Sequence, residues 1–217
     1  MSFSERTGLR VLISGISDGV GLPCALAFAE RGAELILCDI DSAALTRAND
    51  MLGGFSRYCD VISEMSVAAF AHELKSKFSE IDVIINAAGR GYVRTLGMVH
   101  LSNALMPLLG KSGSGGMILN IAPAGGYVST KTMFPYAGSQ KGFQCLSDAI
   151  AAQVKDSPIS VISLVPKLRR KTEHVATNKL YRLERIDEDE LVDRVIAAIG
   201  DKWPQWQRRR SPLNRRA

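Results

Sequence analysis

Short, continuous apolar runs alternate with helical segments along most of this chain. Runs such as Val11-Leu12-Ile13 and Val83-Ile84-Ile85 contain no polar position, which is typical of strands buried on both faces. Strands that alternate with helices form a parallel sheet, because each helix carries the chain back to the edge where the next strand starts. We therefore predict an α/β fold with a doubly wound parallel sheet of about six strands and helices on both faces.

Turn and capping residues set the expected bounds of these elements. Pro23 lies in the first turn of a helix, Gly32 stops that helix, and Ser63 caps a later one. The expected strands are Arg10–Ser14, Glu34–Cys38, Phe55–Asp60, Asp82–Asn86, Gly116–Ile121 and Ser160–Val165. The expected helices are Leu22–Arg31, Ser42–Met51, the segment from Ser63 to Phe78, Arg94–Leu109, Pro135–Lys155 and Asp187–Ile199.

Length and charge indicate one domain followed by a basic tail. A chain of 217 residues with 46% hydrophobic residues can build one full core, and we expect this domain to cover residues 1–207. Residues 208–217 contain five arginines and no acid, and these account for the whole net charge of +5. The tail is either a solvated, disordered end or an arm for an acidic partner. Because no aromatic residues interleave these arginines, nucleic acid is not favoured as that partner.

The remaining composition is typical of a cytoplasmic protein. No apolar run approaches the roughly 20 residues that span a membrane, and the N-terminus lacks the order of a signal peptide. Cys24, Cys38, Cys59 and Cys145 show no CxxC spacing, and Cys38 and Cys59 fall at predicted strand ends. We interpret all four as reduced and mostly buried. The three histidines share no spacing, so we expect no metal site.

A glycine-rich segment, Ser14-Gly15-Ile16-Ser17-Asp18-Gly19-Val20-Gly21, joins the first expected strand to the first helix. Glycines allow a tight turn and a close approach of the backbone to a ligand, and the helix N-terminus offers N–H groups to phosphates. The segment therefore predicts a Rossmann-type nucleotide site. Its spacing, Gly15-xxx-Gly19-x-Gly21, resembles that of the short-chain dehydrogenase/reductase family, with Ser14 where that family usually has threonine.

The resemblance runs from about Gly8 to Val165 and implies a nicotinamide cofactor. In the family, a carboxylate at the position of Asp39 binds the adenosine ribose and repels a 2′-phosphate; the other interpretation of Asp39 is a plain helix-start residue. NADP-preferring relatives often have a basic residue at the position of Asp18, so both acids favour NAD over NADP. Asp60-Val61 resembles the adenine-contacting pair, and Asn86-Ala87-Ala88-Gly89 and Asn120-Ile121 resemble two further family segments. The expected cofactor-binding residues are Ser14, Gly15, Ser17, Asp18, Gly19, Val20, Gly21, Asp39, Asp60, Val61, Asn86, Ala87, Ala88, Gly89 and Pro166.

The catalytic residues that the resemblance implies are only partly present. Tyr136 matches the family's general acid/base, but the lysine expected four residues later is Gln140. Lys141 is adjacent, yet a regular helix places it about 140° from the face of Tyr136, so only a local distortion would bring it back. Pro123 stands at the serine position and Arg94 at the asparagine position, and an arginine cannot accept a proton. The chain therefore resembles a shortened family member with a degenerate catalytic set.

Two segments on the substrate side also depart from the family. Only about five residues separate Gly89 from Arg94, and the basic run Lys167–Lys171 follows Pro166. That run either grips phosphates or forms a solvated loop. The resemblance also implies a homodimer or tetramer built on the helices Arg94–Leu109 and Pro135–Lys155.

Three hypotheses for function follow. The first is an NAD(H)-dependent oxidoreductase that acts on a small-molecule carbonyl or alcohol with Tyr136 as acid/base. The second is a catalytically weak or inactive NAD-binding sensor or partner subunit. The third is a purely structural or assembly role. Nucleotide binding separates the third from the other two, and turnover separates the first from the second.

Overall fold

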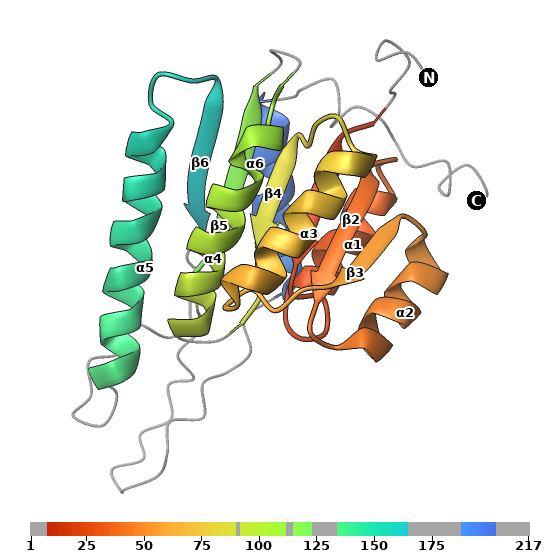
Figure 1. The fold of residues 1–217 in the computed structure, drawn as a ribbon, viewed down its shortest axis with the longest axis horizontal. Coiled ribbons are helices and arrows are strands. Elements are labelled where there is room, and N and C mark those ends of the chain that lie inside the picture. Colours follow the sequence, from red (N-terminus) through yellow and green to blue (C-terminus); the bar gives the residue numbers. More distant parts are fainter. Residues whose placement is uncertain (1–7, 90–91, 112–114, 123–133, 165–187, 203–217) are drawn as a thin grey trace, which may run out of the picture.

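A computed structural model describes residues 8–89, 92–111, 115–122, 134–164 and 188–202 of the chain (Figure 1). Six strands form one sheet in the order β3-β2-β1-β4-β5-β6, and every neighbouring pair is parallel. This order confirms the predicted doubly wound sheet. The strands are β1 (Arg10–Ser14), β2 (Glu34–Asp39), β3 (Phe55–Tyr58), β4 (Val83–Asn86), β5 (Gly116–Ile121) and β6 (Ile159–Leu164). The helices are α1 (Gly21–Ala29), α2 (Ser42–Leu52), α3 (Glu64–Lys77), α4 (Tyr92–Leu105), α5 (Phe134–Gln153) and α6 (Glu188–Lys202).

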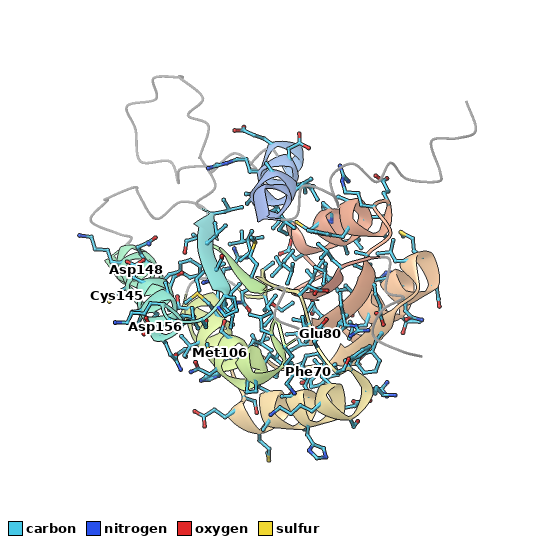
Figure 2. The ribbon with its side chains drawn as sticks, turned by 90° about the horizontal axis from the view of Figure 1, so that it is seen from above. Phe70, Glu80, Met106, Cys145, Asp148 and Asp156 are labelled. Atoms are coloured by element: carbon cyan, nitrogen blue, oxygen red, sulfur yellow. The ribbon has the colours of Figure 1, made fainter. Side chains whose placement is uncertain are left out.

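Helices cover the sheet on both faces, and the core divides into two clusters (Figure 2). Alternate residues along β1 show the division, since Val11 and Ile13 belong to one cluster and Leu12 to the other. The first cluster packs against α1, α2 and α6, and the second against α3, α4 and α5. Strands buried from both sides explain why the sequence shows continuous apolar runs rather than alternation.

Hydrogen-bonding groups explain where some elements end. The helix α4 ends at Leu105 rather than at the expected Leu109, and a 3₁₀ turn covers Met106–Leu108. Pro107 has no N–H to donate to the preceding turn, so the regular helix cannot continue through it. The strand β3 ends at Tyr58, two residues before the expected end, because the Asp60 N–H donates to the Ser66 side chain of α3 instead of to β2.

The cap predicted at Ser63 is present, and Asp41 supplies a second cap that was not predicted. The Ser63 hydroxyl accepts the N–H of Ser66 at the start of α3, and the Asp41 carboxylate accepts the N–H of Ala44 at the start of α2. In the part of the chain that the structure describes, no helix is both long and apolar enough to cross a membrane.

Candidate functional site

The carboxyl ends of β1, β2 and β4 meet where the strand order reverses. The chain goes outward from β1 to β2 and β3, then crosses to β4 on the other side of β1. In open parallel sheets this reversal leaves a crevice in which ligands bind. Ser14 at the end of β1 is in register with Cys38 on one side and Asn86 on the other. The predicted cofactor residues of three strands therefore share one edge of the sheet.

The glycine loop packs tightly where it leaves β1 and is open at its tip. At Gly15 the backbone has φ of 81°, and a side-chain carbon there would overlap the backbone of Ala88. At Gly21 a side-chain carbon would overlap the Gly15 carbonyl, which explains why α1 begins on a glycine. Gly19 has φ of 72° and nothing within 4 Å of the position its Cβ would occupy. The loop therefore exposes backbone at its tip, as a phosphate cradle requires.

Val20, the residue that precedes α1, supplies no side-chain cap to the helix. Backbone N–H groups at the start of a helix carry a partial positive charge and bind anions. Together with the open tip at Gly19, this arrangement fits the pyrophosphate of a dinucleotide.

Asp39 connects the end of β2 to the glycine loop. One carboxylate oxygen accepts the Ser17 N–H at 2.9 Å, and the other accepts the Asp41 N–H at 3.0 Å. Asp39 is 5% exposed, so its charge lies under the loop rather than out in solvent. A carboxylate has about four acceptor positions, and the two bonds leave capacity for further donors such as ribose hydroxyls. Asp39 therefore positions the loop, a role that reasoning from the sequence did not find.

The turn after β3 lies beside Asp39. The Cys59 N–H donates to the Asp39 carbonyl at 3.0 Å, and Asp60 and Val61 follow directly. Val61 is buried, and its carbonyl is 3.0 Å from Nδ1 of His100 on α4. The predicted adenine-contacting pair is therefore fixed at the same end of the sheet as the predicted ribose-binding acid. His100 contributes to this packing, whereas His72 is exposed on α3.

The end of β4 belongs to a buried chain of polar side chains. Nδ2 of Asn86 donates to Ser102 Oγ at 3.1 Å and to Asn120 Oδ1 at 2.8 Å. Asn120 donates in turn to Ser147, which is 2.6 Å from Ser163. Asn86 Oδ1 is buried and has no hydrogen-bond partner. This series of hydrogen-bonded side chains joins β4, β5, β6, α4 and α5 beneath the carboxyl edge.

Reasoning from the sequence identified only some of these hydrogen-bonded side chains. The family segments pointed to Asn86 and Asn120, but nothing indicated Ser102, Ser147 or Ser163. One signal was available: Asn120 interrupts an apolar strand, and a polar residue at a fully buried strand position requires a partner.

Ser14 forms hydrogen bonds with the segment that follows β4. The Ser14 hydroxyl accepts the N–H groups of Ala87 and Ala88, each at 3.3 Å. A hydroxyl at this position therefore fixes the loop between Asn86 and Gly89, which places that backbone against Gly15. Serine supplies the same oxygen that threonine would.

Arg94 lies at the carboxyl ends of β4 and β5. Its Nε donates to the Gly89 carbonyl at 2.8 Å, and Nη1 lies 3.3 Å and 3.4 Å from the carbonyls of Ile121 and Ala122. This position, aligned with the family's asparagine, thus carries a permanent cation that binds main-chain oxygens. Its contacts connect the start of α4 to the end of β5.

The predicted acid/base residue lies in the first turn of α5. The helix runs through Tyr136, Gln140 and Lys141, so Gln140 remains one turn from Tyr136, and the Lys141 side chain is exposed. The side chains of Tyr136 and Gln140 lie outside the part of the chain that the structure describes. So do Pro123, Pro166, the run Lys167–Lys171 and residues 208–217.

Among the described residues, no group of three or more metal-ligating side chains could hold a metal ion. All four cysteines are free; Cys24, Cys38 and Cys59 are buried and Cys145 is exposed. This agrees with the interpretation of the cysteines as reduced and mostly buried.

The fold and this edge define a nucleotide-binding α/β protein of the dehydrogenase type. Comparison with protein families narrows that class: residues 15–93 match a model described as enoyl-(acyl carrier protein) reductase, and residues 92–180 match a model described as short chain dehydrogenase. The chain belongs to the short-chain dehydrogenase/reductase family of oxidoreductases, whose members use a nicotinamide cofactor.

Individual relatives agree with this assignment. The 7alpha-hydroxysteroid dehydrogenase of Escherichia coli is 29% identical, over 73% of this chain and 70% of its own length. The probable oxidoreductase EphD of Mycobacterium bovis is 25% identical over 89% of this chain. The chain spans 40% of the length of that mycobacterial relative.

Solved structures share the fold. A short chain dehydrogenase/reductase from Burkholderia phymatum in complex with NAD has a TM-score of 0.75 at 18% identity, over 90% of this chain and 86% of that one. A metagenomic short-chain oxidoreductase in complex with NADP has a TM-score of 0.71 at 21% identity, over 88% of this chain and 90% of that one.

Proposed function

We propose that this protein is an NAD(H)-dependent oxidoreductase that acts on a carbonyl or alcohol group, with Tyr136 as the acid/base. The observation that carries the cofactor choice is the position of Asp39, whose carboxylate lies at the end of β2 and is bonded to the glycine loop. A buried negative charge there repels the 2′-phosphate of NADP and accepts the ribose hydroxyls of NAD.

The residues of this chain divide the work of binding. The loop from Gly15 to Gly21 and the start of α1 hold the pyrophosphate, and Asp39 holds the adenosine ribose. The pair Asp60-Val61 borders the adenine. The segment from Asn86 to Gly89 brings backbone close to the nicotinamide end. When bound, the cofactor supplies the hydride chemistry, and the chain supplies its orientation.

Tyr136 would donate or accept the proton at its phenolic oxygen. A free tyrosine has a pKa near 10, so an efficient acid/base needs a neighbouring cation to lower that pKa. Gln140 carries no charge at the position one turn further along α5, and Lys141 is exposed. We therefore expect weak turnover, reduced by roughly 10²–10⁴-fold relative to a complete catalytic set.

The incomplete catalytic set favours a second candidate function, an NAD-binding sensor or partner subunit that does not turn over substrate. Gln140 in place of lysine and the commitment of Arg94 to backbone carbonyls both favour it. Both candidates require NADH binding, and they differ in turnover alone.

One experiment on one sample tests both proposals. NADH and NADPH are titrated by calorimetry, and NADH oxidation is then followed over a panel of ketones and aldehydes. The oxidoreductase proposal is supported if NADH binds more tightly than NADPH and if slow turnover is seen in the wild type and lost in Tyr136→Phe. Turnover that persists in Tyr136→Phe removes the role of that tyrosine, and binding without any turnover supports the second candidate.

A gain-of-function variant tests the acid/base role of Tyr136 directly. Gln140→Lys restores a cation on the face of Tyr136 and is expected to raise the rate above that of the wild type. The matched control is Lys141→Gln, which removes a neighbouring cation from an exposed position and should leave the rate unchanged. Equal rates in all three proteins would contradict an acid/base role for Tyr136.

A further inference from the structure

Two cysteines meet under the adenosine end of the site. Cys38 is the penultimate residue of β2, and Cys59 follows β3 directly. Cys38 is in register with Arg57, so Cys59, two residues further on, points to the same face of the sheet. Both belong to the buried cluster beneath α3, with exposures of 0% and 1%.

The backbone places these two cysteines at diagonally related positions, since Cys38 is opposite Arg57 and Cys59 follows two residues later. The Cys59 N–H donates to the carbonyl of Asp39, the residue after Cys38, at 3.0 Å. Each cysteine is followed by an acid of the proposed cofactor site, Asp39 in one case and Asp60 in the other. Any change in the separation of the two sulfurs is therefore transmitted directly to both acids.

The two thiols also differ in the direction of their pKa shifts. The Cys38 thiol, and then the Ser66 hydroxyl, lower the pKa of Cys59, while burial opposes them. The pKa of Cys38 is raised, first by its interaction with Cys59 and then by burial. A cysteine with a lowered pKa beside a second thiol with a raised pKa is a feature of redox-sensitive pairs. Cys24 provides the contrast, since burial raises its pKa to about 12.

We propose that Cys38 and Cys59 form a reversible disulfide that weakens cofactor binding at the adjoining ends of β2 and β3. The disulfide follows from the placement of the two cysteines alone, and its effect on the cofactor rests on the proposed function. The oxidant is a peroxide, a small molecule; Cys59 is itself 1% exposed and follows the 54%-exposed Tyr58 at the end of β3.

The chemistry balances with hydrogen peroxide as the oxidant. The Cys59 thiolate attacks one peroxide oxygen, the O–O bond breaks, and a sulfenic acid forms while hydroxide leaves. The Cys38 sulfur then displaces the sulfenic hydroxyl, which departs as water with the Cys38 proton, and the S–S bond forms. The peroxide gains two electrons, one from each cysteine.

The bond would change the site because it draws the sulfurs together. A disulfide holds its sulfurs about 2.05 Å apart, closer than two thiols in contact. Shortening that separation moves the end of β2 against the turn after β3. Asp39 then shifts relative to Ser17, whose N–H it accepts, and Asp60 shifts with Cys59.

The first arm of the test follows the disulfide by itself. The folded full chain carrying Cys145→Ser, which removes an exposed thiol on the outer helix α5, is treated with hydrogen peroxide, and remaining thiols are alkylated (Figure 2). Peptide mapping should find a Cys38–Cys59 link that dithiothreitol removes. The link should persist when Cys24→Ser is added, and should be absent with Cys59→Ser. A Cys59 oxidised without a link, or a link found only after unfolding, would overturn the proposal.

The second arm measures coupling to the cofactor. Peroxide treatment should weaken NADH binding by about fivefold or more, a typical coupling between sites, and dithiothreitol should restore it. The Cys24→Ser variant should respond in the same way, and Cys59→Ser should not respond. Unchanged NADH affinity in the cross-linked protein would overturn the coupling.

The two proposals fail in different ways. If the reduced protein binds no NADH, the proposed function and the coupling both fail, while the mapped disulfide stands. If Cys59→Ser does not fold, the link in the peroxide-treated protein and its removal by dithiothreitol still decide whether the pair forms.

Discussion

At the scale of single residues, Asp39 has a structural role beside the binding role that we propose for it. Its two hydrogen bonds hold the N–H groups of Ser17 and Asp41, so the residue organises the glycine loop and the start of α2 before any ligand arrives. A carboxylate that is already oriented by its neighbours loses little freedom when it accepts ribose hydroxyls, which favours binding.

Substitutions at Asp39 separate these roles. Asp39→Ala leaves two N–H groups without their acceptor, so we expect a loss of about 1–3 kcal/mol in the free energy of unfolding together with weaker NADH binding. Asp39→Asn keeps an acceptor oxygen and removes the charge, so stability should fall less and NADPH should bind better relative to NADH. Urea unfolding and calorimetry measure the two effects. An unchanged NADH/NADPH ratio in Asp39→Asn would contradict the charge argument.

The glycines of the loop differ in how much space surrounds the position that a side chain would occupy. In Gly21→Ala the new methyl group meets the Gly15 carbonyl, so we expect a loss of about 1–3 kcal/mol or more in the free energy of unfolding and loss of NADH binding. Gly19→Ala is the matched control, because the space around its Cβ is open and only the positive φ opposes it, at about 1–2 kcal/mol. Equal losses of unfolding free energy and of NADH affinity in both variants would contradict the argument that overlap with the Gly15 carbonyl makes Gly21 necessary.

At the scale of elements, β3 is held at the sheet edge by α3 as well as by β2. Arg57 on β3 makes a bidentate contact with Glu73 on α3, with Nε 3.0 Å from both carboxylate oxygens. The guanidinium also lies 5.2 Å from the centroid of the Phe55 ring. The helix that carries Glu73, α3, packs on the cluster that contains Cys38 and Cys59.

That pair makes stability depend on pH. Arg57 lowers the pKa of Glu73 in the folded protein below its ordinary value of 4.5. Its stabilisation is therefore present above the ordinary pKa and is lost as the pH falls through the folded pKa. We expect Glu73→Gln to be less stable than the wild type at pH 7, and the difference to shrink as the pH falls below 4.5. A double-mutant cycle with Arg57→Gln, measured by urea unfolding across this range, isolates the pair, and a coupling that does not weaken on acidification would contradict it.

At the scale of the whole molecule, the site joins parts of the chain that are far apart in sequence. The glycine loop follows β1, Asp39 follows the first helix, and Asn86 follows the third. A ligand that contacts all three segments stabilises the folded state as a unit, because the unfolded chain cannot bind it.

Cofactor binding should therefore raise the melting temperature. At an NADH concentration of 100 times its Kd, the free energy of unfolding should rise by about 2.7 kcal/mol. For a chain of this size that corresponds to a shift of about 5–10 °C, measurable by differential scanning fluorimetry. The Asp39→Ala variant at the same NADH concentration should show a smaller shift. A wild-type melting temperature that does not respond to NADH would contradict dinucleotide binding.

Much of this arrangement is local in origin and was readable from the sequence. The order of strands and helices follows from apolar runs a few residues long, and the glycine loop follows from residue types at fixed spacing. The positions of Asp39 and Asn86 at strand ends follow in turn, since parallel strands bring their carboxyl ends to one edge. The break at Pro107 and the early end of β3 were missed because they depend on hydrogen bonds rather than on hydrophobic pattern.

Which side chains meet at that edge depends on how the whole chain folds. The link from Asn86 to Asn120 spans 34 residues, and Asp39 reaches Ser17 across 22. The pairing of Cys38 with Cys59 depends on the register of β2 with β3. No local period encodes such contacts, because they depend on how strands align and on which face each side chain takes. The local pattern of residues specifies an α/β nucleotide-binding chain, whereas the pairing of strands across the sheet brings Asp39 to the glycine loop and places Cys38 and Cys59 in one buried cluster.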